Sequence, residues 1–106
     1  MAQGPAGAMD FGYLEGFAAG DAGVVLEVLA LFRQQAEGWV GKLDGNDPGW
    51  RDLVHTIKGA ARGVGANALG DECARAEAEG AGRLTAVRAA LERTVTDIAA
   101  YQAARA

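Results

Sequence analysis

Apolar residues recur at steps of three and four along most of the chain, which is the period of an amphipathic helix. The first such segment follows Asp10, a good N-cap residue, and is expected to end at Gly20 as a short helix. Its apolar positions are Phe11, Leu14 and Phe17. Asp21 is the expected cap of a second and longer helix, which should run to about Leu43.

The second helix is expected to be broadly buried, because its apolar positions form one wide stripe. These positions are Val25, Val28, Leu29, Phe32, Ala36, Trp39, Val40 and Leu43, with Val24 and Leu31 widening the stripe.

Further breaks divide the rest of the chain into three helices. In GNDPGW, Asp47 as N-cap and Pro48 at the first helical position predict a start, and Gly65 is the predicted stop. Asn67 is the expected cap of the next helix, which should end at Glu79. The predicted core positions of the three helices are Trp50, Leu53, Val54, Ile57, Ala60, Ala61 and Val64; Ala66, Leu69, Cys73 and Ala76; and Leu84, Val87, Leu91, Thr94, Ile98 and Tyr101.

This pattern predicts an all-α fold. Short connections favour antiparallel neighbours, so we expect an antiparallel up-and-down four-helix bundle with a short additional N-terminal helix. Residues 1–9 are rich in Gly and Ala, with nothing to bury, and are expected to be a flexible tail. Residues 10–106 are then a single helical domain, in keeping with a length of 106 residues.

Composition and charge exclude several classes of function. The net charge of −4 argues against a nucleic-acid binder with a basic face. Cys73 is the only cysteine, so neither an intramolecular disulfide nor a structural zinc site is expected. The opening MAQGPAGAMD lacks the features of a signal peptide, and no apolar run approaches the ~20 residues that span a membrane. We therefore expect a cytoplasmic protein that does not contact a membrane.

The only histidine of the chain, His55, falls on the polar face of the third predicted helix. At 100° per residue, His55 lies more than about 90° from the centre of the sector that holds the apolar residues of this helix. Gly59 follows one turn later on the same face, and Arg51, Lys58 and Arg62 flank it. Each feature alone fits an ordinary solvated surface. Gly59 in particular carries little weight by itself, because 16 of the 106 residues are glycine. Their coincidence on one face favours a functional site.

The chemistry available to such a site is phosphoryl transfer. With an unperturbed pKa near ~6.5, an imidazole is mostly neutral at pH 7 and its unprotonated nitrogen is a nucleophile. The missing side chain at Gly59 would leave room for a phosphoryl group, and Lys58 and Arg62 could balance its charge. No second base, acidic pair or metal cluster lies nearby in sequence, so a carrier whose partners supply the catalytic groups is favoured.

The segment from His55 to Ala60, HTIKGA, together with Gly65-Ala66, Leu69, Cys73 and Glu77, resembles the histidine-containing phosphotransfer (HPt) domain family. The family pattern is His-x-Leu-Lys-Gly-Ser/Ala, then Gly-Ala, a leucine, often a cysteine, and Leu-Glu. The spacing agrees throughout. Two positions depart mildly, Ile57 in place of leucine and Ala76 in place of a larger apolar residue.

The resemblance implies a four-helix bundle that carries a phosphoryl group between receiver domains, without being an enzyme itself. It assigns the phosphoacceptor to His55, the phosphate-side charge to Lys58 and the steric clearance to Gly59. Gly65, Ala66, Leu69 and Cys73 are then structural residues of the motif.

The implied partners are the receiver domains of a hybrid histidine kinase and of a response regulator. A receiver offers an acidic pocket with bound Mg²⁺, so Arg51 and Arg62 are candidate partner-binding residues, and no cofactor or metal is expected on this chain itself. Exposed apolar residues near His55 should belong to the same surface. The family usually uses Nε2 of the histidine. We expect a monomer, because the apolar stripes fit one closed bundle.

Three other interpretations stay open. The chain could be a docking module that binds receiver domains without being phosphorylated, which an intact His55 with Lys58 and Gly59 disfavours. It could also be the phosphoacceptor domain of a larger chemotaxis-type kinase. The lack of a trailing linker or ATP-binding segment favours an independent protein. A hydrolase with His55 as general base is the weakest candidate, because no nucleophile or oxyanion donor can be named.

Overall fold

Residues 9–105, the part that the computed structural model describes, contain helices and connecting turns and no strand. Most of the predicted flexible tail, residues 1–8, lies outside this described part. The all-α prediction is confirmed. The helices are α1 (Phe11–Phe17), α2 (Ala22–Val40), α3 (Trp50–Val64), α4 (Asn67–Glu79) and α5 (Leu84–Ala104), with a single 3₁₀ turn, η1 (Ala81–Arg83), before α5.

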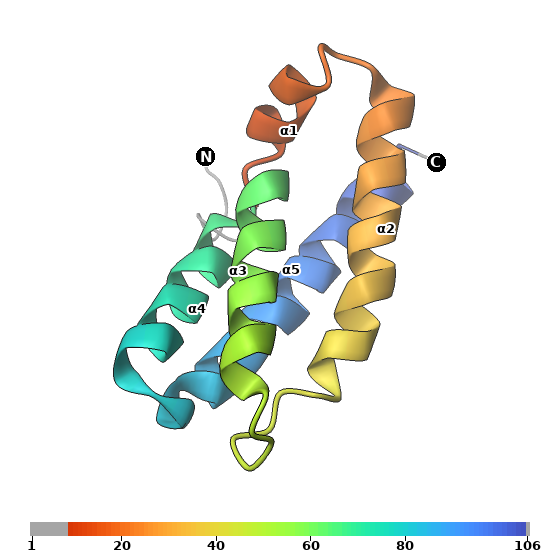
Figure 1. Ribbon diagram of the computed structural model, residues 1–106. Coiled ribbons are helices and arrows are strands. Elements are labelled where there is room, and N and C mark those ends of the chain that lie inside the picture. Colours follow the sequence, from red (N-terminus) through yellow and green to blue (C-terminus); the bar gives the residue numbers. More distant parts are fainter. Residues whose placement is uncertain (1–8, 106) are drawn as a thin grey trace.

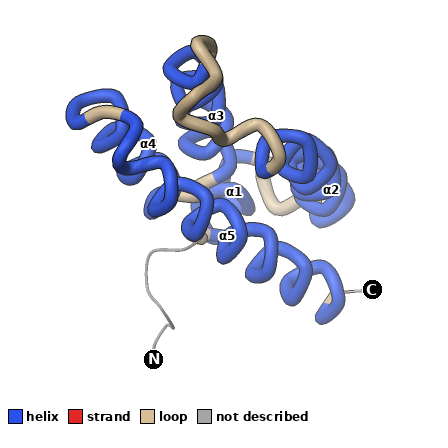
Figure 2. The backbone as a smooth tube through the Cα atoms, turned by 90° about the horizontal axis from the view of Figure 1, so that it is seen from below, coloured by secondary structure: helices blue, strands red, loops and turns tan. Residues whose placement is uncertain are grey.

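Helices α2 to α5 form a bundle in which each helix runs in the direction opposite to the one before it (Figure 1). Helix α2 contacts α3 and α5, and α4 contacts the same two helices, so the four close around one interior. Seen along the bundle, α4 and α2 lie on the two flanks, with α3 on one side and α5 crossing obliquely on the other (Figure 2). The short α1 lies beyond the C-terminal end of α3, where it contacts α2 and α3.

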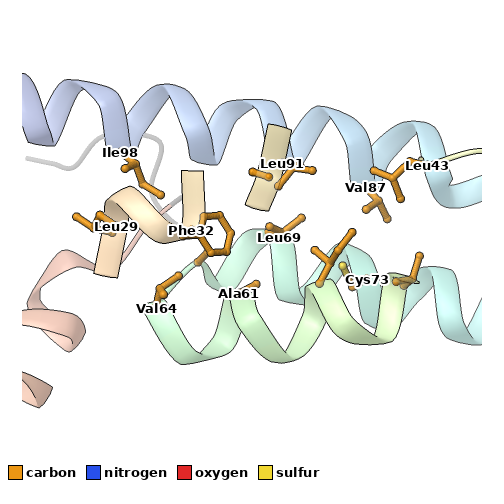
Figure 3. Packing of buried hydrophobic residues seen from close by; sticks show 14 of the residues in the cluster. Leu29, Phe32, Leu43, Ala61, Val64, Leu69, Cys73, Val87, Leu91 and Ile98 are labelled. Carbon is orange, nitrogen blue, oxygen red and sulfur yellow. The ribbon is translucent and has the colours of Figure 1, made fainter. Parts of the chain in front are cut away.

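The core is built from aliphatic side chains of all four long helices, which meet between α5 on one side and α3 and α4 on the other (Figure 3). Every core position predicted for α5 is buried, as is every one predicted for the fourth helix. The fully buried large side chains include Leu29, Val54, Ile57, Leu69, Val87, Leu91 and Ile98. Because interiors of this kind are close-packed, the core holds α3 and α4 in fixed register.

The helix starts at Asp10 and Asp21 are confirmed. The Asp10 carboxylate accepts a hydrogen bond from the Tyr13 N–H at 3.0 Å, and the Asp21 carboxylate accepts one from the Val24 N–H at 3.1 Å. Each side chain satisfies one of the backbone donors that a helix leaves unpaired at its N-terminus.

The predicted helix ends at Gly65 and Glu79 are also confirmed, whereas one boundary each of α2, α3 and α4 was wrong by one to three residues. Helix α3 begins at Trp50, because Asp47 caps a preceding turn instead: its carboxylate accepts from the Gly49 N–H at 2.8 Å, and its carbonyl from the Trp50 N–H at 3.1 Å. Ala66 holds the N-cap position of α4, and Asn67 is the first helical residue. Helix α2 ends at Val40. Leu43 is nevertheless buried, beyond the end of the helix.

Three residues assigned to the apolar faces of the first two predicted helices are exposed. Phe17 is 79% exposed, because it is the last residue of α1, which ends there and not at Gly20. Leu31 and Val24 are 57% and 42% exposed, since they lie at the edge of the α2 stripe, beyond the reach of the neighbouring helices. These exposed apolar side chains lie on α1 and α2.

Within residues 9–105 no helix combines the length and the apolar character that crossing a membrane would need. The cytoplasmic location and the monomeric state stay predictions.

Candidate functional site

His55 lies on the outward face of α3, with 73% of its side chain exposed. The buried residues of this helix are Val54, Ile57, Ala61 and Val64, which share one sector of the helix. His55 follows Val54 by one residue and is therefore turned by about 100° away from the core. The predicted exposure is confirmed.

The imidazole is held from the neighbouring helix α4. Its Nδ1 atom lies 2.9 Å from Oε2 of Glu77. The other carboxylate oxygen of Glu77, Oε1, accepts a hydrogen bond from Nζ of Lys58. One carboxylate thus bridges two residues of α3 that are three positions apart. These bonds, first from Lys58 and then from His55, lower the pKa of Glu77 below its ordinary value.

This contact selects the tautomer of the histidine. An ionised carboxylate is only an acceptor of hydrogen bonds, so Nδ1 must carry the proton that lies between His55 and Glu77. In the neutral ring the lone pair is then on Nε2. Nδ1 is occupied by Glu77, and Nε2 is the nitrogen available as a nucleophile.

Two of the three cations predicted around His55 bind within the chain. Lys58 is only 21% exposed, because its side chain reaches across to Glu77 instead of standing free in solvent. The Nη1 atom of Arg51 donates to the backbone carbonyl of Glu77 at 3.0 Å, and its guanidinium lies 4.6 Å from the centre of the Trp50 ring. Both side chains therefore tie α3 to α4 around Glu77.

Arg62, the third cation, is exposed and lies across α4 at Gly70. A Cβ atom placed on Gly70 would be 3.1 Å from Cγ and 3.3 Å from Nε of Arg62. The absent side chain of Gly70 thus leaves the space that the Arg62 stem occupies.

Gly59 faces open space. A Cβ atom built on it would meet no atom within 4 Å outside its own helical turn. A longer side chain here would extend outward, one turn after His55. The geometry agrees with the predicted clearance, whose role in transfer stays a prediction.

Of the four residues predicted to be structural, Gly65 and Ala66 connect α3 to α4, and Leu69 and Cys73 lie on α4. Gly65 ends α3 with a left-handed φ of 83°. A Cβ on it would be 2.6 Å from the carbonyl oxygen of Asp10, so this glycine also allows α1 to approach. Ala66, Leu69 and Cys73 are completely buried, and burial raises the pKa of the Cys73 thiol to about 12. Cys73 is therefore a protonated core residue.

Glu77 is the functional candidate that reasoning along the sequence missed. It is 22 residues from His55, and its only signal was its place in the motif. The described residues contain no group of three His, Cys, Asp or Glu side chains placed to hold a metal ion. What the site offers is one oriented nucleophile, one carboxylate and a row of cations.

Comparison with known proteins agrees with this geometry. The model of the Hpt domain family matches residues 27–104. The crystal structure of the histidine phosphotransferase ShpA from Caulobacter crescentus is similar to the chain, with 59% sequence identity and a TM-score of 0.85 over 93% of this chain and 94% of that one. No curated protein sequence matches the chain at a significant level.

Proposed function

The chain belongs to the Hpt domain family, and from this premise we propose that it is a histidine phosphotransfer protein of a two-component phosphorelay whose phosphoacceptor is Nε2 of His55. It would accept the phosphoryl group from an aspartyl phosphate on the receiver domain of a hybrid histidine kinase and pass it to the receiver of a response regulator. The observation that carries this proposal is the exposed His55 with its Nδ1 atom bound to Glu77.

The transfer step needs one nucleophile from this chain. The Nε2 lone pair attacks phosphorus, the Nε2–P bond forms, and the P–O bond of the aspartyl phosphate breaks, with its electron pair leaving on the aspartate carboxylate. Nε2 carries no proton in this tautomer, so none must leave before attack. The reverse sequence returns the phosphoryl group to a second aspartate.

Glu77 stabilises the product of this step. After attack the ring keeps the proton on Nδ1 and carries a positive charge, which faces the Glu77 carboxylate across 2.9 Å. A carboxylate in this position orients the ring and stabilises the imidazolium, as the aspartate of a Ser-His-Asp triad does. Lys58 is bound to the same carboxylate and adds positive charge beside the incoming phosphoryl group.

The chain would act as a carrier and not as an enzyme. A receiver pocket with bound Mg²⁺ would supply the remaining catalytic charge, and this chain would need no cofactor of its own. Gly59 would allow the rim of that pocket to approach His55, since nothing occupies the space above it.

The exposed apolar residues of α2 offer a second part of the docking surface. Arg33 marks the edge of α2 that faces α5, because its Nη1 atom donates to Gln102 at 2.6 Å. At 100° per residue, Val24 and Leu31 lie nearly opposite Arg33, on the edge toward α3. We therefore extend the proposed receiver-binding surface from His55 across α3 to this edge.

A radiolabel assay tests the proposal. A receiver domain of a hybrid kinase from the source organism is charged with ³²P-acetyl phosphate and Mg²⁺ and mixed with the wild type or with His55→Gln. We expect acid-labile, alkali-stable label on the wild type and none on the variant. Equal labelling of both proteins would overturn the assignment of His55.

The alternative of a docking module without phosphorylation predicts a different result. Wild type would then bind receivers but take no label from any of them. The circular dichroism spectra of both proteins should coincide and both should unfold cooperatively, because His55 is exposed and makes no core contact. That control separates loss of the acceptor from loss of the fold.

A further inference from the structure

Arg62 differs from the other two cations near His55 in having no ionic partner within the described chain. Lys58 is bound to the Glu77 carboxylate, and Arg51 to the Glu77 carbonyl. Among residues 9–105, no carboxylate lies within 4.0 Å of the Arg62 guanidinium. Its charge is therefore not neutralised by a contact inside the bundle.

The position of Arg62 is nevertheless defined, because Gly70 lies under its stem. Gly70 is buried on α4, and its Cα faces the Cγ and Nε atoms of Arg62. With a Cβ at this position, the nearest arginine atom would be only 3.1 Å away and the side chain would have to shift. Glycine is also less favourable than alanine in a helix interior. Gly70→Ala would therefore stabilise α4 itself but would displace the Arg62 side chain from its seat, the space over Gly70.

Arg62 lies on the same side of α3 as the nucleophile. Arg62 follows His55 by seven residues, which is two turns on the same side and about 10 Å along the axis of α3. Gly59 lies between them with open space above it. A partner that brings a phosphorylated aspartate to His55 across Gly59 therefore covers Arg62 with the rim of its pocket.

We propose that Arg62, seated on Gly70, is the cation that binds the acidic rim of the receiver domain, whereas Arg51 and Lys58 organise Glu77. This inference rests on the proposed phosphotransfer function and assigns to it a docking residue. Gly70 is a positioning residue that acts through Arg62. Charges at the rim of an interface mainly change the rate of association and its dependence on salt, which gives the proposal a specific signature.

The test measures initial transfer rates from the phosphorylated receiver that labels the wild type fastest, as a function of receiver concentration and of NaCl. For Arg62→Ala we expect the KM for the receiver to rise about 5-fold at low salt with kcat unchanged, and the slope of log(kcat/KM) against log[NaCl] to become shallower. Arg62→Lys should recover part of the affinity. Arg93→Ala, on the exposed face of α5, is the matched control and should behave as wild type.

Gly70→Ala tests the seat. We expect Gly70→Ala to raise the KM for the receiver less than Arg62→Ala does. The KM of the double variant Arg62→Ala/Gly70→Ala should equal that of Arg62→Ala, because the glycine acts only through the arginine. Additive effects of the two substitutions would overturn the role of Gly70. A wild-type KM and salt slope for Arg62→Ala would overturn the role of Arg62 while label on His55 still supported phosphotransfer. A wild type that no receiver labels would overturn the proposed function and this inference with it.

Discussion

Nδ1 of His55 and Oε2 of Glu77 lie 2.9 Å apart, on two helices and 22 residues apart in the chain. The contact joins the exposed nucleophile to the rigid part of the molecule, because Glu77 follows the buried residues Cys73 and Ala76 on α4. It also assigns different roles to the two ring nitrogens, one bound to the carboxylate and the other open to solvent.

Removing the Glu77 carboxylate should slow phosphoryl acceptance. Glu77→Ala leaves Nδ1 without its acceptor, so the ring loses its tautomer preference and its orientation. We expect a rate about 10-fold lower, which is the lower end of the loss seen when the hydrogen-bond partner of a metal-bound histidine is removed. Glu77→Gln keeps an acceptor oxygen but not the charge, so its transfer rate should lie between those of the wild type and Glu77→Ala. Stopped-flow transfer kinetics check this, and a wild-type rate in Glu77→Ala would contradict it.

The stability of the fold should depend on pH through Glu77. Its hydrogen bonds lower its pKa in the folded state below the ordinary value of 4.5. The unfolded chain then binds a proton more readily, so the contribution is fully present above pH 4.5 and is lost as the pH falls through the folded pKa. Denaturation midpoints of wild type and Glu77→Gln should therefore differ at pH 7 and converge as the pH falls below 4.5. A difference that does not change with pH would count against the charged contact.

Gly59 should lower the stability of the fold while leaving space for a receiver domain to reach His55. It is a helix-interior glycine with open space around its Cα, so Gly59→Ala should raise the free energy of unfolding by about 1 kcal/mol. Gly59→Gln should also fold normally but accept the phosphoryl group more slowly, because its side chain extends into the space that a receiver needs. Urea denaturation and transfer rates measured on the same samples test both statements. Native transfer by Gly59→Gln would remove clearance from the account.

Gly65 should tolerate no side chain. Its φ of 83° is left-handed, and a Cβ would lie 2.6 Å from the Asp10 carbonyl oxygen. Gly65→Ala should therefore lower the free energy of unfolding by about 2 kcal/mol, from backbone strain alone, with the clash in addition. Thermal melts of Gly65→Ala and Gly63→Ala give the comparison, since Gly63 has open space around it. Equal melting temperatures would contradict this reading of the turn.

Helical periodicity predicted the fold well because the core positions of each helix share one face. In α5, all six predicted positions from Leu84 to Tyr101 are buried. The same reasoning failed at Phe17, Val24 and Leu31, because periodicity shows which residues are apolar but not how far neighbouring helices reach. The predicted start of α3 was wrong because an aspartate can cap a turn as well as a helix, and Asp47 caps the turn before α3.

The sequence analysis predicted those features of the site that depend on a single helix and missed those that depend on how two helices pack. The outward direction of His55 follows from its position relative to Val54 on α3, and the sequence analysis found it. The partner of His55 depends on the register between α3 and α4, which the packing of Leu69, Cys73 and Ala76 sets in three dimensions. For the same reason the contacts of Lys58 and Arg51 with Glu77 were not foreseen, while the predicted roles of Lys58 toward the phosphoryl group and of Arg51 toward a partner stay predictions.

The central claim is that Glu77 holds Nδ1 so that Nε2 of His55 takes the phosphoryl group. Because the chain contains one histidine, ¹⁵N-histidine labelling reports on this residue alone. The measurement is the one-bond coupling between ³¹P and ¹⁵N in the phosphorylated protein, with the nitrogens assigned by their couplings to the ring protons. The account predicts coupling at Nε2 and a proton on Nδ1. Coupling at Nδ1, or a phosphorylated protein with no coupling to histidine, would contradict it.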